Sequence, residues 1–311
     1  MMADDPAAHC SCGTQILPEP GEFAAWLDRF RQDDFLAGLA ILCDKPKSSL
    51  LSILDTYMNE ALFYYVDVRL QMSPHHRILE IGSGIGFLSL WIELHGFDVV
   101  ALEPNAGFFD LFAKIAMEVR RFAGGKREPL NVTAEQLDPE THGRFDVVFS
   151  FNVLEHIDHL EQACAAMVAC LAPGGRMMHV CPNYVFPYEP HFGVPLLPGF
   201  PGITRRIFDK KISSNQELWL SLNFVTSHRI QRVANRHGLQ VTFQPGLMHR
   251  FMDRVFTDEL FRKRHDATPG GSMLVRILGG LRLCGLLGLL KYVPPGWATP
   301  MSFTCGNHTE P

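Results

Sequence analysis

The sequence is short of positive charge, with 28 Lys and Arg residues against 33 Asp and Glu residues and a formal net charge of −5 at pH 7. Proteins that bind nucleic acid in general need a positive surface to neutralise phosphates, so this balance argues against that class of partner. No internal repeat is visible either. With 47% hydrophobic residues over 311 positions, the chain can bury one large core, and its length suits one elaborated domain or two small ones.

A secretory signal is also absent, because the first residues, MMADDPAAHCSCG, lack a positive segment followed by an apolar core. We therefore expect a cytoplasmic chain, in which a reducing environment keeps the eight scattered cysteines as thiols. Cys10 and Cys12, beside His9, would make half of a metal site, but no matching pair lies elsewhere at zinc-ligand spacing. We expect residues 1–21 to form a flexible lead-in.

An unbroken apolar run long enough to span a membrane is missing too. The most apolar stretch, MLVRILGGLRLCGLLGLLKYVPP, is interrupted by Arg276, Arg282 and Lys291. An Arg near the membrane centre costs roughly 2.5 to 3.5 kcal/mol on insertion scales, which disfavours a spanning helix. Two interpretations stay open: residues 273–297 lie at the membrane interface as a basic apolar helix, or they pack on the domain or against a second copy in a homodimer.

What the sequence does contain is a glycine-rich turn after a predicted strand. Residues 77–81, RILEI, predict a strand buried on both faces of a parallel sheet. The turn that follows has Gly82, Gly84 and Gly86, whose missing Cβ atoms permit positive φ and let a ligand approach the backbone closely. An apolar helix and a second strand, residues 98–102, lead to Glu103. This acid lies about 20 residues beyond the turn, where doubly wound folds place the acid that binds a ribose.

The spacing E-x-G-x-G-x-G differs from the G-x-G-x-x-G of dinucleotide-binding proteins and resembles that of the class I S-adenosylmethionine (AdoMet) methyltransferases. In that family the glycine turn holds the amino-acid end of AdoMet, and the acid after the second strand holds the ribose. The resemblance assigns these roles to the first two strand ends, at Glu80, Gly82, Ser83, Gly84, Gly86, Glu103 and Pro104.

Two later segments agree with this resemblance. RFDVVFSFN, residues 144–152, predicts a fourth strand followed by L-E-H, and L-A-P-G-G, residues 171–175, closes the next helix before a fifth strand. The similar region is roughly residues 75–184. It implies an α/β fold with a doubly wound, mostly parallel, seven-stranded sheet of the Rossmann-like type. Its remaining strands are expected at Pro129–Val132, Leu239–Gln244 and Pro300–Cys305.

The remaining parts of the chain predict a cap and two insertions. Apolar residues at helical spacing in residues 22–72 indicate two or three helices before an AdoMet-binding domain at residues 73–311. In this cap, Tyr57, Tyr64 and Tyr65 either line a pocket or simply pack on the domain. The domain contains insertions at residues 185–225 and 247–297. Within the first insertion, the proline and glycine of residues 187–202, PYEPHFGVPLLPGFPG, exclude regular structure and favour an ordered loop over the site.

The resemblance also places residues around the adenine. In the family, the end of the third strand carries residues that flank this ring, commonly including an acid. Here Thr133 stands where Asp is usual, so Glu135 or a backbone contact would take that role, beside Ala134. Asn152, after the fourth strand, is also expected to bind the cofactor.

Candidate bases for removing a proton from an acceptor fall in two groups. In the related ubiquinone-biosynthesis O-methyltransferases the first position reads E-V-L-E-H and supplies metal ligands, whereas this chain reads N-V-L-E-H. Because Asn152 replaces the first acid, we predict no metal site, with Mg²⁺ at Glu155 and His156 as the weaker alternative. His156 is either a base or the start of a helix.

The second group follows the fifth strand. Here His191 is a candidate base, and Tyr184 and Tyr188 are candidates to orient an acceptor hydroxyl. The alternative for these residues is a loop held together by side-chain hydrogen bonds.

The sequence thus predicts an AdoMet-dependent methyltransferase that releases S-adenosylhomocysteine. We expect the acceptor to be an oxygen of a small molecule, a lipid or a lipid-linked intermediate. Alternatives are methyl transfer to nitrogen or sulfur, a catalytically silent subunit that binds a partner or membrane, and an NAD-dependent oxidoreductase, which the glycine spacing disfavours. The expected location is the cytoplasm, with peripheral membrane contact through residues 273–297.

Overall fold

The fold is known from a computed structural model that describes residues 16–104, 110–266 and 269–307. One sheet has the strand order β2-β1-β3-β4-β8-β7. The first four strands in this order are parallel, and β8 runs antiparallel to both of its neighbours. The six strands are β1 (Arg77–Ile81), β2 (Asp98–Leu102), β3 (Phe145–Phe151), β4 (Leu171–Cys181), β7 (Leu239–Gln244) and β8 (Met301–Asn307). The predicted doubly wound α/β fold is confirmed.

The predicted seventh strand, Pro129–Val132, is wrong. Only Leu130 reaches the sheet, where it forms an isolated parallel bridge with Leu102. Pro129 has no N–H to donate, and the chain turns away at Thr133 into the short 3-10 helix η3 (Ala134–Gln136). One bridging residue is too few to make a strand.

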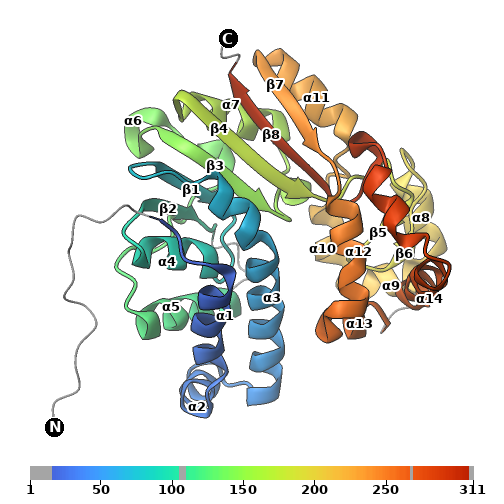
Figure 1. Cartoon of the computed structure of the whole chain (residues 1–311), viewed down its shortest axis with the longest axis horizontal. Helices are drawn as coiled ribbons and strands as arrows, with labels where there is room; N and C mark the ends of the chain where they lie inside the picture. The colour runs from blue at the N-terminus through green and yellow to red at the C-terminus, as the bar shows by residue number, and fades with distance from the viewer. Residues whose placement is uncertain (1–15, 105–109, 267–268, 308–311) are drawn as a thin grey trace.

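Helices cover both faces of the sheet (Figure 1). One face carries α1 (Pro20–Asp28), α2 (Asp33–Cys43), α3 (Lys47–Gln71), α4 (Phe87–Leu94) and α5 (Asp110–Ala123), and the other carries α7 (Leu160–Ala169) and α11 (Ser227–Arg236). The predictions for residues 1–15, including the Cys10 and Cys12 pair, lie outside the described residues.

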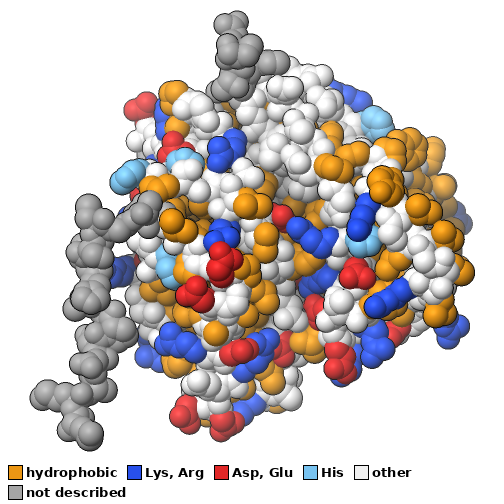
Figure 2. All heavy atoms as spheres, in the orientation of Figure 1, with side chains coloured by type: hydrophobic (Ala, Val, Ile, Leu, Met, Phe, Trp, Pro, Cys, Tyr) orange, Lys and Arg blue, Asp and Glu red, His pale blue; other side chains and the backbone are white. Residues whose placement is uncertain are grey.

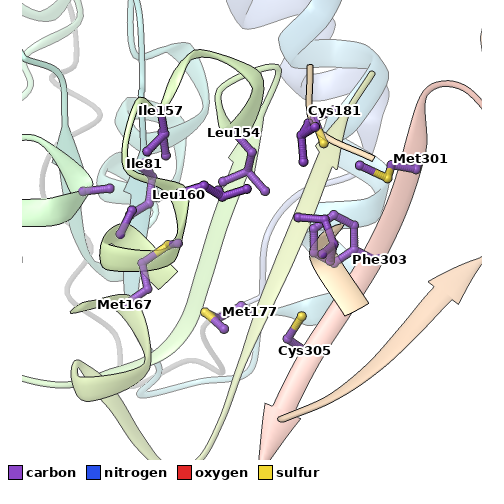
Figure 3. Close-up of a cluster of buried hydrophobic side chains, with 14 of the residues drawn as sticks. Ile81, Leu154, Ile157, Leu160, Met167, Met177, Cys181, Met301, Phe303 and Cys305 are labelled. Atoms are coloured by element: carbon purple, nitrogen blue, oxygen red, sulfur yellow. The ribbon is translucent and has the colours of Figure 1, made fainter. Parts of the chain in front are cut away.

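The two faces have separate apolar cores, because side chains along each strand point alternately to either face. On one face, Phe23 and Trp26 of α1 contact Trp91 of α4, and this cluster extends to Ile78 and Val147 of the sheet. Figure 3 shows the other core, in which Met167 of α7, Met177 of β4 and Phe303 of β8 lie together. The helical cap therefore shares a core with the sheet.

The first insertion contains more regular structure than expected. It forms a small hairpin and a series of short helices: β5 (Tyr188–Glu189), β6 (Val194–Pro195), α8 (Pro201–Ile207), α9 (Asp209–Ile212), η5 (Ser213–Asn215) and α10 (Gln216–Ser221). Pro201 occupies the first turn of α8, where a missing N–H costs nothing. The hairpin and the start of α8 lie within residues 187–202, so the prediction that proline and glycine exclude regular structure in that stretch is wrong.

The second insertion folds into a helical unit beside the sheet: α12 (Leu247–Thr257), α13 (Glu259–Asp266), α14 (Pro269–Leu283), η6 (Leu287–Tyr292) and η7 (Pro295–Trp297). Met252, Val255, Phe261, Leu278 and Leu287 form its buried apolar cluster. In the described ranges, every helix is too short or too polar to cross a membrane.

Candidate active site

A cavity of about 1040 Å³ lies at the carboxyl ends of the parallel strands. In a doubly wound sheet this edge binds ligands where the strand order reverses, and here β1 lies between β2 and β3. Figure 1 shows the arrowheads of β3 and β4 directed toward the region between α3 and the insertions. The sheet, α3 and both insertions all contribute to the cavity wall.

The glycine turn forms one wall with its backbone in the left-handed region. Gly82, Gly84 and Gly86 have φ angles of 66°, 57° and 82°. A Cβ at Gly84 would lie 2.6 Å from the ring of Tyr57 in α3, so only glycine fits at this position. Gly84 N donates a hydrogen bond of 2.7 Å to Glu103 Oε2, which joins the turns after the first two strands.

Burial shifts the pKa values of the two acids next to this turn. Burial raises the pKa of Glu80 to about 7, against the hydrogen bonds from Ser89 and the charge of Arg120. Burial also raises the pKa of Glu103, against the hydrogen bond from Gly84. Ser83 Oγ is buried without a hydrogen-bond partner in the described part of the chain. Such a group at a cavity wall is suited to bind a polar ligand atom.

The predicted cofactor residues all line this one cavity: Glu80, Gly82, Ser83, Gly84, Gly86, Glu103, Pro104, Thr133, Ala134, Glu135 and Asn152. The set fits AdoMet in two respects. The backbone at Gly84 borders the cavity and has no room for a Cβ beside Tyr57, and polar groups at Ser83 and Glu103 face a cavity whose other walls are largely apolar. Asn152, at the end of β3, has a φ of 55°, which Asn tolerates better than most residues.

A buried acid and a histidine form a pair beside the cavity. Glu189 Oε1 lies 2.6 Å from His191 Nδ1, and Glu189 also accepts hydrogen bonds from the backbone N–H groups of His191 and Phe192. Glu189 is fully buried, whereas the His191 side chain is 22% exposed and lines the cavity. Burial acts to lower the pKa of His191, but the hydrogen bond to Glu189 and the charges of Glu189 and Glu155 outweigh it, so this pKa is raised.

His156 lies next to His191, with their ring centroids 5.3 Å apart. Burial and the charge of His191 lower the pKa of His156 to about 4, so His156 is neutral at pH 7. Ser221 Oγ donates its proton to Leu218 O and lies 2.9 Å from His156 Nδ1. Because this hydroxyl has only one proton, Nδ1 must be the donor to Ser221, which leaves Nε2 of His156 with a free lone pair.

The same reasoning applies to His191. The Glu189 carboxylate only accepts, so His191 Nδ1 donates and Nε2 keeps its lone pair while the ring is neutral. Ligand atoms of Glu155, His156 and His191 lie within 4.8 Å of one another. Glu155 is fully buried, and neither of its carboxyl oxygens has a hydrogen-bond partner within the described ranges. These three residues could hold a metal ion.

The predicted acceptor tyrosines divide into one that lines the cavity and one that does not. Tyr188 lines it, its hydroxyl has no partner among the described residues, and burial and Glu189 raise its pKa to about 12. Tyr184 is buried and is absent from the cavity wall; its hydroxyl donates to Glu189 Oε1 at 3.3 Å. The prediction that Tyr184 orients an acceptor is therefore corrected, since Tyr184 holds Glu189 instead.

Several residues of this site could not be assigned from the sequence. Glu189 was not identified as the partner of His191, although the pattern E-P-H places the two side chains only two positions apart. For the three cap tyrosines both alternatives occur: Tyr57 and Tyr64 line the cavity, as one alternative predicted, whereas Tyr65 is buried and donates to Pro18 O. The second insertion supplies an apolar wall made of Phe251, Met252, Val255, Phe261 and Leu274. No local sequence pattern marks these residues as part of a site.

Comparison with known proteins gives relatives over part of the chain. An uncharacterised protein of Mycobacterium tuberculosis is 34% identical over 194 residues, which is 60% of this chain and 65% of that protein. A ubiquinone biosynthesis O-methyltransferase of Marinobacter nauticus is 30% identical over 122 residues, covering 39% of this chain and 49% of that protein. The chain thus spans less than two thirds of the length of these curated relatives.

Among solved structures, a mycolic acid cyclopropane synthase aligns over 80% of this chain and 84% of its own, with a TM-score of 0.48 and 16% identity. The model of the family described as "Methyltransferase domain" matches residues 27–244, which include the glycine turn, Glu103, His156 and His191. The chain belongs to this methyltransferase-domain family, and the resemblance that the sequence predicted is confirmed.

Proposed function

We propose that this protein transfers a methyl group from AdoMet to an oxygen of an acceptor that has an apolar part. The observation that carries the proposal is the common cavity. It is lined by the glycine turn with Glu103 at one side, by His191 and Tyr188 at another, and by the apolar wall of the second insertion. Bound AdoMet would supply an electrophilic methyl group on a positively charged sulfur.

In this proposal His191 is the base that removes the proton of an acceptor hydroxyl. Its Nε2 takes the proton as the acceptor oxygen bonds to the methyl carbon, and the electron pair of the broken carbon–sulfur bond stays on sulfur. Glu189 holds the imidazole in the required tautomer and stabilises its protonated form, as a buried acid does in other acid–histidine pairs. Tyr188, whose hydroxyl has no hydrogen-bond partner among the described residues, would orient the acceptor.

The apolar wall supports a lipid-like acceptor. Phe251, Val255 and Leu274 contribute side chains that cannot hydrogen-bond, so they favour a hydrocarbon portion of the acceptor over a polar one. The hydroxyl to be methylated would then lie toward His191.

One observation favours a second mechanism at the same site. The buried carboxyl of Glu155 has no hydrogen-bond partner within the described residues and lies beside two imidazoles with free Nε2 atoms. Two histidines and one carboxylate suit a transition metal such as Zn²⁺ better than Mg²⁺, which prefers oxygen ligands. Such a metal would lower the pKa of the acceptor hydroxyl and replace His191 as the activating group.

Calorimetry with AdoMet and S-adenosylhomocysteine tests the cofactor, and we expect micromolar binding of both. If neither binds, the catalytically silent subunit becomes the better interpretation. Transfer of label from methyl-labelled AdoMet to hydroxylated lipids then tests the reaction, with the matching lipid amines as the alternative acceptors.

A chelator separates the two mechanisms. If His191 is the base, removing metal ions from the purified protein leaves the rate unchanged. Loss of transfer after chelation, with recovery on adding Zn²⁺ or Mn²⁺, would favour the metal mechanism instead.

A further inference from the structure

One surface combines exposed apolar side chains with basic ones. It consists of residues 197–211, around α8 and α9, and residues 269–297, from α14 to η7, and we call it the α8–α14 face. α14 packs against β6, the strand that leads toward α8, so the two segments are neighbours. Figure 2 shows hydrophobic side chains gathered along the right-hand edge, over α8, α9 and α14 of Figure 1.

The apolar part of this face consists of large hydrophobic side chains that are exposed to solvent. In and before α8, Phe200, Ile203 and Ile207 are exposed and lie at the spacing of one helical face. In α14, Leu278 points inward and is buried, whereas Ile277 is 50% exposed and Leu283 is 91% exposed. A helix that is apolar on its outer side as well as its inner side indicates a surface that contacts another apolar phase.

The charge of this face is opposite to that of the chain. Residues 197–211 and 269–297 contain seven basic residues and one acid, Asp209, although the whole chain has a net charge of −5. None of the seven forms an ion pair within the described residues. The basic residues are Arg205, Arg206, Lys210, Lys211, Arg276, Arg282 and Lys291. A positive patch on a negative protein points to an anionic partner.

We infer that the α8–α14 face docks on a lipid bilayer that carries anionic headgroups. Apolar side chains beside Lys and Arg are typical of helices that lie in the membrane interface, where the apolar groups enter the acyl boundary and the cations meet the headgroups. A second copy of the chain fits less well, because a two-fold interface would bring the two positive faces together.

The position of α14 connects the docking face with the cavity. Leu274 lines the cavity, and Ile277, one turn further along the same helix, is exposed on the docking face. An apolar acceptor would therefore need to pass only beside α14 to move from the bilayer into the cavity. This last step rests on the proposed function, whereas the docking itself does not.

Flotation of the full chain with vesicles tests the inference. We expect binding to phosphatidylcholine vesicles that contain phosphatidylglycerol, no binding to phosphatidylcholine alone, and weaker binding as salt is raised, since salt screens the headgroups. The double variant Arg206→Gln with Arg276→Gln should bind on the order of twentyfold more weakly, because each cation near an anionic surface contributes about fivefold. Ile277→Asp should also weaken binding, because it places a charge at the apolar boundary.

Matched variants on the far side of the molecule provide the control. Lys45→Gln with Lys126→Gln removes the same charge from exposed positions near α2 and α5, and Ile41→Asp adds the same acid at an exposed position of α2. These variants should float like the original chain. Equal losses in both sets, or no binding to either kind of vesicle, would overturn the inference.

Sedimentation velocity without lipid distinguishes a second copy. A dimer that Ile277→Asp separates would assign this face to self-association and contradict membrane docking. Calorimetry with AdoMet on the same variants keeps the two proposals apart, because cofactor binding should be unchanged whatever the vesicles show.

Discussion

At the scale of single residues, burial is the main cause of the pKa shifts of most ionisable groups in the site. Burial raises the pKa of Glu80 and of Glu155 to about 7, and it lowers that of His156 to about 4. His191 differs, because its contact with Glu189 outweighs burial and raises its pKa. The pKa is therefore raised for Glu80, Glu155 and His191 and lowered for His156, so that the two neighbouring histidines protonate in different pH ranges.

Gly84→Val should abolish AdoMet binding, because the left-handed backbone disfavours a β-branched residue and the Cβ meets the Tyr57 ring at 2.6 Å. Calorimetry measures the loss. Gly124→Val is the matched control, since Gly124 also has a positive φ, of 80°, but open space around its Cβ position. Both variants carry the backbone strain, so equal affinity for AdoMet in the two would remove the glycine turn from the binding site.

His191→Ala should slow methyl transfer by about 10² to 10⁴-fold, the usual contribution of a general base, and leave the Kd for AdoMet nearly unchanged. A base works unprotonated, so the rate of the original chain should rise as pH rises through the raised pKa of His191. His156→Ala should slow transfer less, because His156 already lacks a carboxylate partner in the described structure. Equal rates in the two histidine variants would place the proton transfer elsewhere.

Glu189→Gln tests the positioning role of the acid. Without the negative charge the pKa of His191 should fall, so the midpoint of the pH–rate profile should move to lower pH while the maximal rate decreases. An unmoved midpoint would mean that Glu189 is only structural.

Glu80→Gln should change how stability depends on pH. The folded-state pKa of Glu80, about 7, lies above its unfolded value of 4.5, so its contribution favours folding at low pH and is lost as pH rises from about 4.5 to about 7. Gln does not ionise, so the variant does not lose this contribution. The difference in free energy of unfolding between the variant and the original chain should therefore shift in favour of the variant by about 3 kcal/mol as pH rises across that range. Urea unfolding of the cofactor-free protein at pH 5 and pH 8 measures it, and a constant difference would contradict the assignment.

At the scale of elements, α12 is attached to α3 through one buried cation. The Arg254 side chain is 5% exposed and lies 3.0 Å from both Glu60 of α3 and Asp258, and it also stacks over the rings of Phe63 and Phe261. α12 and α3 form two walls of the cavity, and this contact joins them.

Arg254→Ala should therefore lower the free energy of unfolding by about 3 to 5 kcal/mol, the usual cost of removing one partner of a buried ion pair. Arg250→Ala is a control in the same helix, because Arg250 pairs with Asp67 near the surface with 43% of its side chain exposed. That variant should lose less than about 1 kcal/mol. Similar losses in urea unfolding would show that burial does not distinguish the two pairs.

The elements that were predicted well are those with residues at their ends that stop a strand or a helix. The strands β1, β2 and β7 have the predicted limits. β1 and β2 are short, mainly apolar runs, β7 alternates apolar and polar residues, and the three are followed by glycine, an acid and proline respectively. The hairpin β5–β6 and helix α8 could not be predicted in this way, since their prolines stand at positions that tolerate a missing N–H only in the folded context. Pattern alone does not reveal that context.

At the scale of the whole molecule, the sequence predicted the fold and the set of residues around the glycine turn, whereas the acceptor side required the structure. The turn residues are close in sequence and follow strands that must meet at one sheet edge. By contrast, Glu155, His156 and His191 are brought together by an insertion, and Leu274 reaches the same cavity from a helix more than eighty residues further along. Such long-range contacts leave no periodic pattern in the chain.

The shared core of the cap and the sheet predicts how the molecule unfolds. Trp26 of α1 and Trp91 of α4 lie 5.2 Å apart in that core, so residues 22–72 should not melt separately from the sheet. Tryptophan fluorescence and far-UV circular dichroism should then report the same urea transition. Two separated transitions would mean that the cap is an independent domain.

The cavity has walls from different parts of the chain, and this division bears on how such a protein diversifies. In the proposed function, the donor side belongs to the sheet and α3, and the acceptor side belongs largely to residues 185–225 and 247–297. Substitutions that accumulate in these insertions can therefore alter which molecule is accepted while the parts that hold the donor stay under unchanged selection. A lineage carrying this architecture can acquire new acceptors by drift in two surface segments, without passing through an ancestor that has lost its source of methyl groups.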